Sequence, residues 1–350
     1  MWTHVSEQLL IDELSGIHET RVLCTTLGRG QFAAAILASR PLAQVTCHLF
    51  DVYLASETVS HVGAGEGKPI VSCAADFMPE QFELVALPID PRGEAELTRD
   101  LLQAGHERLT IGGRLLAAVS NPDDQWLHGE MRKLFDKVTR LPSQSGVVYR
   151  ATKTAPLKKI KKFECEFAFR DQGKLIKALS RPGVFSHRSL DAGARALINT
   201  MTVRAGDRVL DIGTGSGGVA FAAAFRAPHV AVVALDSHTR AVECTEKGAR
   251  LNGLGNISVI LDDQGNAPDP GRYDLVLGNP PYYSDYRIAE LFLQGAQRAL
   301  KPGGKVLMVG KSPAWFEKRM SDLFAGVRLH AHKLYTVVEA ICVSEGSRLA

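Results

Sequence analysis

The sequence predicts an α/β protein with two tandem domains, each built on a doubly wound, mainly parallel sheet. Short apolar runs alternate with helical segments, which is typical of parallel strands joined by helices. The length of 350 residues corresponds to two domains at roughly 150 residues each. An internal repeat of domain size is the third observation. Because 45% of the residues are hydrophobic and 23% are charged, each half can bury a core of its own.

The repeat aligns residues 21–30 with residues 208–217, and residues 82–116 with residues 273–307. The longer pair aligns without a gap, and both of its members end in a Gly-Gly pair that opens an apolar strand. The two halves are therefore predicted to be copies of one α/β domain. The alternative is that two unrelated folds of the same class align by chance.

The two copies differ where the second half carries polar side chains. Cys24 stands where the second half has Asp211, and Pro88 stands where it has Asn279. The first copy keeps the apolar scaffold and lacks both polar groups. We therefore predict that the first copy is degenerate and that the second is catalytic.

Turn-forming residues and cations gather between the two copies, in residues 141–163, where no acid occurs. The cations of this stretch are Arg150, Lys153, Lys158, Lys159, Lys161 and Lys162. Contact with phosphate groups and a solvated linker both fit this composition. The predicted parts are a degenerate domain over 1–145, a basic connecting segment over 146–170 and a catalytic domain over 171–350.

The second half shows the strand–helix alternation most regularly. Strands are predicted at 208–212, 230–235, 257–261, 274–277 and 305–309, with helices at 218–226 and 240–252. In sheets of this kind, ligands bind beyond the carboxyl ends of the strands. The two motifs described next both lie at such ends.

A glycine-rich turn follows the first of these strands, at Gly213, Gly215 and Gly217. Glycines allow tight turns and close approach of a ligand to the main chain, but many nucleotide sites share them. Asp211, two residues before the first glycine, is more selective, because a carboxylate disfavours a pyrophosphate and favours a cationic ligand. S-adenosylmethionine carries a sulfonium and an α-amino group. The alternative role for Asp211 is a helix cap or turn residue.

Asp236 ends the following strand. An acid about 20 residues after a glycine-rich turn can accept hydrogen bonds from both hydroxyls of a ribose. This fits S-adenosylmethionine and NAD equally well. Asp236 therefore indicates a nucleoside and does not identify the cofactor.

The second motif is Asn279-Pro280-Pro281-Tyr282, which follows an apolar strand. The Asn279 side-chain oxygen and the Pro280 carbonyl can each accept one N–H of a planar amine. Those bonds aim the nitrogen lone pair at a methyl donor, and the nitrogen can lose its proton after transfer. Pro280 and Pro281 stiffen the turn, and Tyr282 can stack on a base. The alternative is an ordinary proline turn.

Together these motifs resemble the N-P-P-[YF] signature of class I, S-adenosylmethionine-dependent methyltransferases that act on amino nitrogens. Residues 181–193, which include Gly183-Val184-Phe185-Ser186 and Leu190-Asp191, resemble the segment that precedes the first strand in the small-domain ribosomal RNA guanine-N2 methyltransferases. That family has two tandem Rossmann-like domains, the first degenerate. The resemblance covers nearly the whole chain.

The resemblance implies S-adenosylmethionine as cofactor, ribosomal RNA or a ribosomal subunit as partner, and guanine N2 as the methylated atom. It places Phe185 and Ser186 over the cofactor, although core packing fits Phe185 equally well. It also places Asp262 or Asp263 near the adenine amino group, where a loop-cap role is an alternative. The chain departs from the family at Tyr282-Tyr283, where the guanine enzymes usually carry Phe-His.

This departure leaves adenine N6 in RNA and glutamine N5 in a protein as alternative targets. A dinucleotide-dependent oxidoreductase and a non-catalytic RNA-binding module are alternatives of other classes. Glutamine methyltransferases usually carry a small helical N-terminal domain, so the duplicated first half favours ribosomal RNA.

The remaining sequence features predict a cytoplasmic protein. The net charge of +3 permits nucleic acid without requiring it. The six cysteines are scattered, which indicates free thiols in a reducing compartment and no metal site. Neither a signal peptide nor an apolar run of about 20 residues is evident. The oligomeric state cannot be inferred from the sequence.

Overall fold

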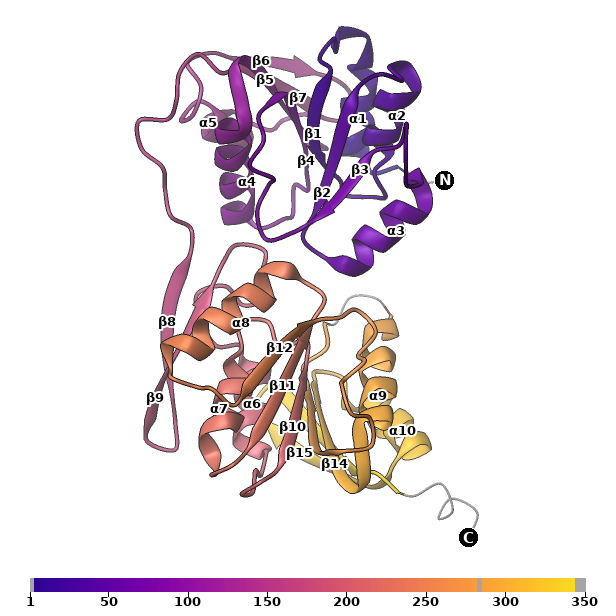
Figure 1. Ribbon diagram of the computed structural model, residues 1–350, viewed down its shortest axis with the longest axis vertical. Coiled ribbons are helices and arrows are strands. Elements are labelled where there is room, and N and C mark those ends of the chain that lie inside the picture. The colour runs from indigo at the N-terminus through magenta and orange to yellow at the C-terminus, as the bar shows by residue number, and fades with distance from the viewer. Residues whose placement is uncertain (1–2, 282–284, 344–350) are drawn as a thin grey trace. The chain divides into compact units, whose positions relative to one another are not determined.

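The computed structural model describes residues 3–281 and 285–343 and divides the chain into two compact units, Met1–Phe163 and Glu164–Ala350 (Figure 1). We describe each unit by itself. Among the described residues, no helix has both the length and the apolar character that a membrane crossing requires.

The first unit is built on a seven-stranded sheet. Its strands, in spatial order, are β3 (Ile70–Cys73), β2 (Gln44–Leu49), β1 (Arg21–Thr25), β4 (Phe82–Ile89), β5 (Leu109–Val119), β7 (Val147–Thr152) and β6 (Val138–Pro142). One face packs against α1 (Val5–Asp12), α2 (Gln31–Ser39) and α3 (Val52–Val62). The other face packs against α4 (Ala95–Arg108) and α5 (Trp126–Met131). A short 3₁₀ turn, η1 (Leu14–Gly16), precedes β1.

The second unit repeats this arrangement. Its strands, in spatial order, are β12 (Ile257–Leu261), β11 (Ala231–Asp236), β10 (Arg208–Ile212), β13 (Tyr273–Gly278), β14 (Leu300–Gly310), β16 (Tyr335–Ile341) and β15 (Ala325–His332). One face packs against α6 (Ala192–Thr200), α7 (Gly218–Arg226) and α8 (Thr239–Leu251). The other packs against α9 (Arg287–Ala299) and α10 (Pro313–Leu323).

The two sheets have the same strand order, which confirms the predicted fold of two tandem doubly wound domains. The first five strands of each unit are parallel, and the last two pair antiparallel. Even the irregularity recurs, because the register shifts after Phe82 in β4 and after Tyr273 in β13. Shared topology and a shared register shift favour duplication over a chance alignment of unrelated folds.

The boundary between the units lies later than the sequence predicts. Residues 146–170 are not one connecting segment, because β7 pairs with β5 in the first sheet. The part that follows, up to Phe163, stays with the first unit. From Cys165 the chain enters a separate two-stranded sheet of β8 (Cys165–Asp171) and β9 (Lys174–Ser180), which belongs to the second unit. The predicted segment joined β7, whose apolar side chains are buried in the first sheet, to the cations that follow it.

Candidate active site

The two motifs of the second unit lie at neighbouring strand ends. Strand β10 pairs with β13 so that Ile212 is opposite Gly278. The glycine-rich loop that begins at Gly213 therefore starts beside Asn279, at the carboxyl edge of the sheet. This edge is where parallel α/β sheets bind their ligands.

Asp211 is a buried carboxylate at the end of β10, with 3% of its surface exposed. Its Oδ2 atom accepts a hydrogen bond from the Thr214 hydroxyl at 2.8 Å. Burial raises the pKa of Asp211 to about 7, an increase that the Thr214 hydrogen bond opposes and the nearby Asp236 carboxylate strengthens. Within the described residues, the groups that shift this pKa include no cation. A cationic ligand would relieve the cost of burying this charge.

The glycine loop takes backbone angles that ordinary residues rarely adopt. The φ angles of Gly213, Gly215 and Gly217 are +73°, +57° and +82°. A Cβ atom on Gly217 would lie 2.3 Å from the ring of Phe221, so packing excludes a larger residue there. A Cβ atom on Gly215 would meet only the Phe185 carbonyl, 3.9 Å away. The main chain at Gly215 is therefore open to close approach by a ligand.

The start of α7 can accommodate an anion. Gly217 caps this helix without any side-chain hydrogen bond. The Asp211 carboxylate accepts a hydrogen bond from the Ala220 N–H in the first turn, so Asp211 also has the capping role that its position allows. The other backbone N–H groups of a helix start can bind carboxylates and phosphates. The cofactor that the sequence predicts ends in a carboxylate, so the loop offers groups for both of its charges: Asp211 for the cation and the helix start for the anion.

Asp236 lies at the end of β11 and is already engaged by the loop. Its Oδ2 atom accepts the Gly215 N–H at 2.8 Å, and its Oδ1 atom accepts the His238 N–H at 2.9 Å. Each carboxylate oxygen has a further lone pair, so the group can also accept from ribose hydroxyls. Burial lowers the pKa of His238 to about 4, which keeps the neighbouring ring neutral.

The segment of residues 181–193 is anchored beside the loop by α8. The buried Arg240 guanidinium donates to the Pro182 carbonyl at 2.8 Å, and Arg181 forms an ion pair with Glu243 at 2.5 Å. Phe185 is 59% exposed, so core packing does not explain its ring. Ser186, at φ +57°, donates its hydroxyl to the Ser189 carbonyl at 2.9 Å. A non-glycine residue in this region is strained, which is common at ligand sites.

Asn279 is held by the residue that caps α6. Its Nδ2 group donates to Asp191 Oδ2 at 3.0 Å, and the same carboxylate accepts the Gly193 N–H at 2.7 Å. Because Nδ2 is the donor of this bond, Oδ1 is the acceptor atom of the amide, and no side chain or backbone group of the described residues bonds to it. A Cβ atom on Gly193 would lie 3.0 Å from Asn279 Oδ1, so glycine makes room for the amide.

The rest of the N-P-P turn is only partly described. Pro280 is buried and Pro281 is half-buried, which suits a stiff turn at a sheet edge. Tyr282 lies outside the described residues, so its predicted stacking role stays a prediction.

The loop after β12 separates the roles of Asp262 and Asp263. Asp262 Oδ1 accepts the N–H groups of Gln264 and Asn266, at 3.0 Å and 2.8 Å, so it caps its own loop. Asp263 is half-buried and forms no side-chain hydrogen bond within the described residues. Of the two, Asp263 is therefore the better placed for a ligand.

The corresponding edge of the first unit is filled by α1. At the sequence offset that relates β1 to β10, Ser6 corresponds to Gly193 and Glu7 to Ala194. The Ser6 hydroxyl donates to the Ile89 carbonyl at 2.7 Å, which is the counterpart of the Pro280 carbonyl. Glu7 accepts the Phe32 N–H at the start of α2, at 3.0 Å, and the Thr26 hydroxyl. Both side chains are fully buried.

Comparison with known proteins identifies the family that the second unit matches. Residues 176–339 match the family described as the methyltransferase small domain. The chain therefore contains a methyltransferase small domain. This domain spans β9 to β16, and so includes the glycine loop and the N-P-P turn.

Relatives and a solved structure extend the likeness beyond the methyltransferase small domain. A ribosomal RNA small subunit methyltransferase C from Pseudomonas entomophila is 29% identical over 259 residues, which are 72% of this chain and 73% of that protein. The protein of the same name from Chromohalobacter salexigens is 35% identical over 155 residues, 41% of this chain and 45% of that protein.

The fold of the whole chain matches a T. thermophilus 16S rRNA N2 G1207 methyltransferase, RsmC, solved in complex with AdoMet and guanosine. The TM-score is 0.76 at 22% identity, over 95% of this chain and 92% of that one. The match confirms the two-domain class I methyltransferase fold around the methyltransferase small domain.

Three supporting residues of the site were not predicted from the sequence. They are Asp191, which orients Asn279; Thr214, which bonds Asp211; and Arg240, which anchors the 181–193 segment. Asp191 carried a signal, because an acid before a small-residue helix is a typical N-cap. Nothing in the spacing relates Arg240 to Pro182, because that contact depends on the packing of α8.

Proposed function

We propose that this protein is an S-adenosylmethionine-dependent methyltransferase that acts on guanine N2 of small-subunit ribosomal RNA. The observation that carries the proposal is the pairing of β10 with β13, which sets a buried carboxylate and an oriented amide at adjacent strand ends. The fold shared with a guanine-N2 enzyme and the relatives named for the small ribosomal subunit support the choice of substrate. Such a substrate belongs to the cytoplasm.

In this proposal the cofactor is held by the loop of the second unit. Asp211 faces its cationic part, the start of α7 takes its carboxylate, Asp236 takes the ribose, and Asp263 is the candidate for the adenine amine. Phe185 and Ser186 flank the loop from the 181–193 segment. The cofactor supplies an electrophilic methyl group when bound.

The chain's own contribution to the reaction is orientation. Asn279 Oδ1 and the Pro280 carbonyl accept the two N–H bonds of the guanine amine, which directs the nitrogen lone pair toward the methyl group. Asp191 fixes which atom of the Asn279 amide is the acceptor. The amine gains a positive charge on attack and then releases a proton to solvent, so no strong base is required beforehand.

A dinucleotide-dependent oxidoreductase is disfavoured by the same geometry. A pyrophosphate at the glycine loop would lie close to the buried Asp211 carboxylate, and like charges in a buried site repel strongly. The first unit is proposed to be non-catalytic. Its Ser6 and Glu7 side chains bond the Ile89 carbonyl and the Phe32 N–H, whose counterparts in the second unit are proposed to bind ligands.

The direct test is to replace Asn279 and to measure turnover and cofactor affinity separately. We expect Asn279→Ala to lower kcat by roughly 100-fold or more, since the amine loses an orienting acceptor, while the Kd for S-adenosylmethionine changes less than about twofold. Turnover is measured as labelled N2-methylguanosine in small subunits that lack the modification. Label in another nucleoside would overturn the guanine assignment, and unchanged turnover would overturn the role of Asn279.

A further inference from the structure

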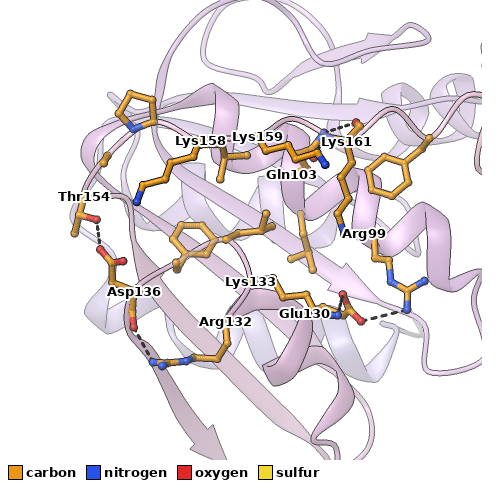
Figure 2. A pocket seen from close by; sticks show the side chains of 17 residues that line it. Arg99, Gln103, Glu130, Arg132, Lys133, Asp136, Thr154, Lys158, Lys159 and Lys161 are labelled. Carbon is orange, nitrogen blue, oxygen red and sulfur yellow. Dashed lines mark hydrogen bonds and ion pairs between the residues drawn. The ribbon is translucent and has the colours of Figure 1, made fainter.

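A basic cavity of about 550 Å³ lies within the first unit, away from the edge that Ser6 and Glu7 fill. It opens between α4, the residues that follow α5, and the strap of residues 154–163, which runs on from β7 (Figure 2). Neither the cofactor site nor the N-P-P turn contributes to it.

The strap is fixed in place by hydrogen bonds on both sides of the cavity. Gln103 on α4 donates to the Lys161 carbonyl at 2.9 Å and accepts the Lys161 N–H at 2.8 Å. At the other end, the Thr154 hydroxyl donates to Asp136 Oδ2 at 2.6 Å. Arg132 in turn donates to the Asp136 carbonyl at 2.7 Å. These bonds hold the strap at the mouth of the cavity.

Positive charge dominates the cavity wall. Its charged residues are Arg99, Arg132, Lys133, Lys158, Lys159 and Lys161 against Glu130 and Asp136. Burial alone would raise the pKa of Glu130, but hydrogen bonds from Lys133 and Arg99 lower it overall. Glu130 is therefore ionised, and its negative charge is balanced by ion pairs with these two residues.

Three lysines of the strap contribute positive charge that no acid of the described residues balances. In the part of the chain that the structure describes, Lys158, Lys159 and Lys161 form no ion pair, and all three are exposed. Figure 2 shows them along the strap, with Arg132 and Lys133 across the cavity. A cluster of unpaired cations is an attractive site for phosphate groups.

The floor of the cavity is apolar. Leu102 and Phe135 are buried there, while Leu134, Leu157 and Phe163 are half-buried. A phosphate ion needs no such floor, and Asp and Glu side chains have no apolar ring to cover it. A nucleotide uses both parts, since its phosphates suit the cations and its sugar or base suits the apolar surface. The volume falls within the roughly 300–1,000 Å³ of sites that enclose small ligands.

We propose that this cavity binds single-stranded RNA, with phosphates on the strap lysines and a nucleoside over the apolar floor. The proposal rests on the proposed function, because it takes the occupant to be part of the RNA that the second unit methylates. The degenerate unit then serves as the substrate-binding half of the enzyme.

The test removes two strap charges and leaves the packing intact. In Lys158→Gln/Lys159→Gln we expect the affinity for a labelled single-stranded oligoribonucleotide of about 12 nucleotides to fall about tenfold or more. The slope of log K against log salt concentration should flatten by roughly 0.7 for each phosphate that the variant no longer neutralises. In methylation assays the KM for RNA should rise by a similar factor while kcat stays within about twofold.

The matched control is Lys68→Gln/Arg92→Gln, which removes two exposed charges of the same unit outside the cavity. It should change RNA affinity less than twofold. Equal losses in both variants, or no loss in the strap variant, would overturn the site. Polyglutamate that competes with RNA as strongly as an oligonucleotide would overturn the choice of RNA. RNA binding that depends on the strap lysines, in a protein without methylation activity, would support the cavity and refute the proposed function.

Discussion

We predict that Asp211 makes cofactor binding sensitive to pH. Its pKa is raised to about 7 by burial, and a cationic ligand favours the ionised form. We therefore expect the affinity for S-adenosylmethionine to rise about tenfold between about pH 6 and about pH 8, as the carboxyl loses its proton. Titration calorimetry in buffers of different ionisation enthalpy will also detect the released proton. Asp211→Asn should bind more weakly at high pH and show a flat profile; a wild-type profile in that variant would contradict this role.

The same carboxyl should shift folding stability in the opposite direction. Because its pKa is higher in the folded protein than in the unfolded chain, its contribution to stability is fully present below the unfolded value of 3.8 and is lost as pH rises through about 7. Urea unfolding of the cofactor-free protein at about pH 8 should therefore show Asp211→Asn to be more stable than the wild type.

Asp191 is a positioning residue with two separable tasks, capping α6 and orienting Asn279. Serine at this position can cap the helix but is too short to reach the amide. We expect Asp191→Ser to fold normally, bind cofactor normally and lose roughly tenfold to 100-fold in kcat. Asp191→Asn, which can do both tasks, should recover most of the rate. A loss of kcat in Asp191→Ser matched by a loss of thermal stability would point to a purely structural role.

At the scale of elements, the start of α7 depends on one glycine. Gly217 combines a φ of +82° with contact to Phe221. Alanine there should destabilise the second unit by about 2–5 kcal/mol, from backbone strain and overpacking together. Gly206, at φ +80° with open space around it, is the matched control, and Gly206→Ala should cost about 1–2 kcal/mol. Equal costs in chemical denaturation would show that contact with Phe221 contributes nothing.

The elements were the most predictable level of the structure. Every strand and helix predicted in the second half is present, because apolar periodicity and glycine turns specify them locally. Because Asp211, Asp236 and Asn279 all lie at or just after strand ends in the sequence, their position at the carboxyl edge of the sheet was also predictable. The sequence could not show that Asp262 caps its own loop, that Asp191 holds Asn279, or that the strap folds over α4, since each depends on side chains that meet only after packing.

At the scale of the whole molecule, the protein should bind one cofactor for its two similar domains. We expect calorimetric titration to give a stoichiometry of about one, because Glu7 and Ser6 fill the first site. In thermal scans, saturating S-adenosylmethionine at about 100 times its Kd should stabilise only the second unit, by about 2.7 kcal/mol. Glu7→Ala should destabilise the first unit by about 1–3 kcal/mol, since the Phe32 N–H loses its buried acceptor, and should leave the stoichiometry unchanged. Two bound cofactors would refute this account.

Helix α1 also makes the first unit complete without a ligand at its sheet edge. A domain whose helix start is bonded by its own glutamate needs no ligand there, whereas the second unit keeps the glycine loop that we propose for the cofactor. If the basic cavity binds RNA as proposed, its affinity for RNA should not depend on the methyl donor, because the fold of the first unit needs no cofactor.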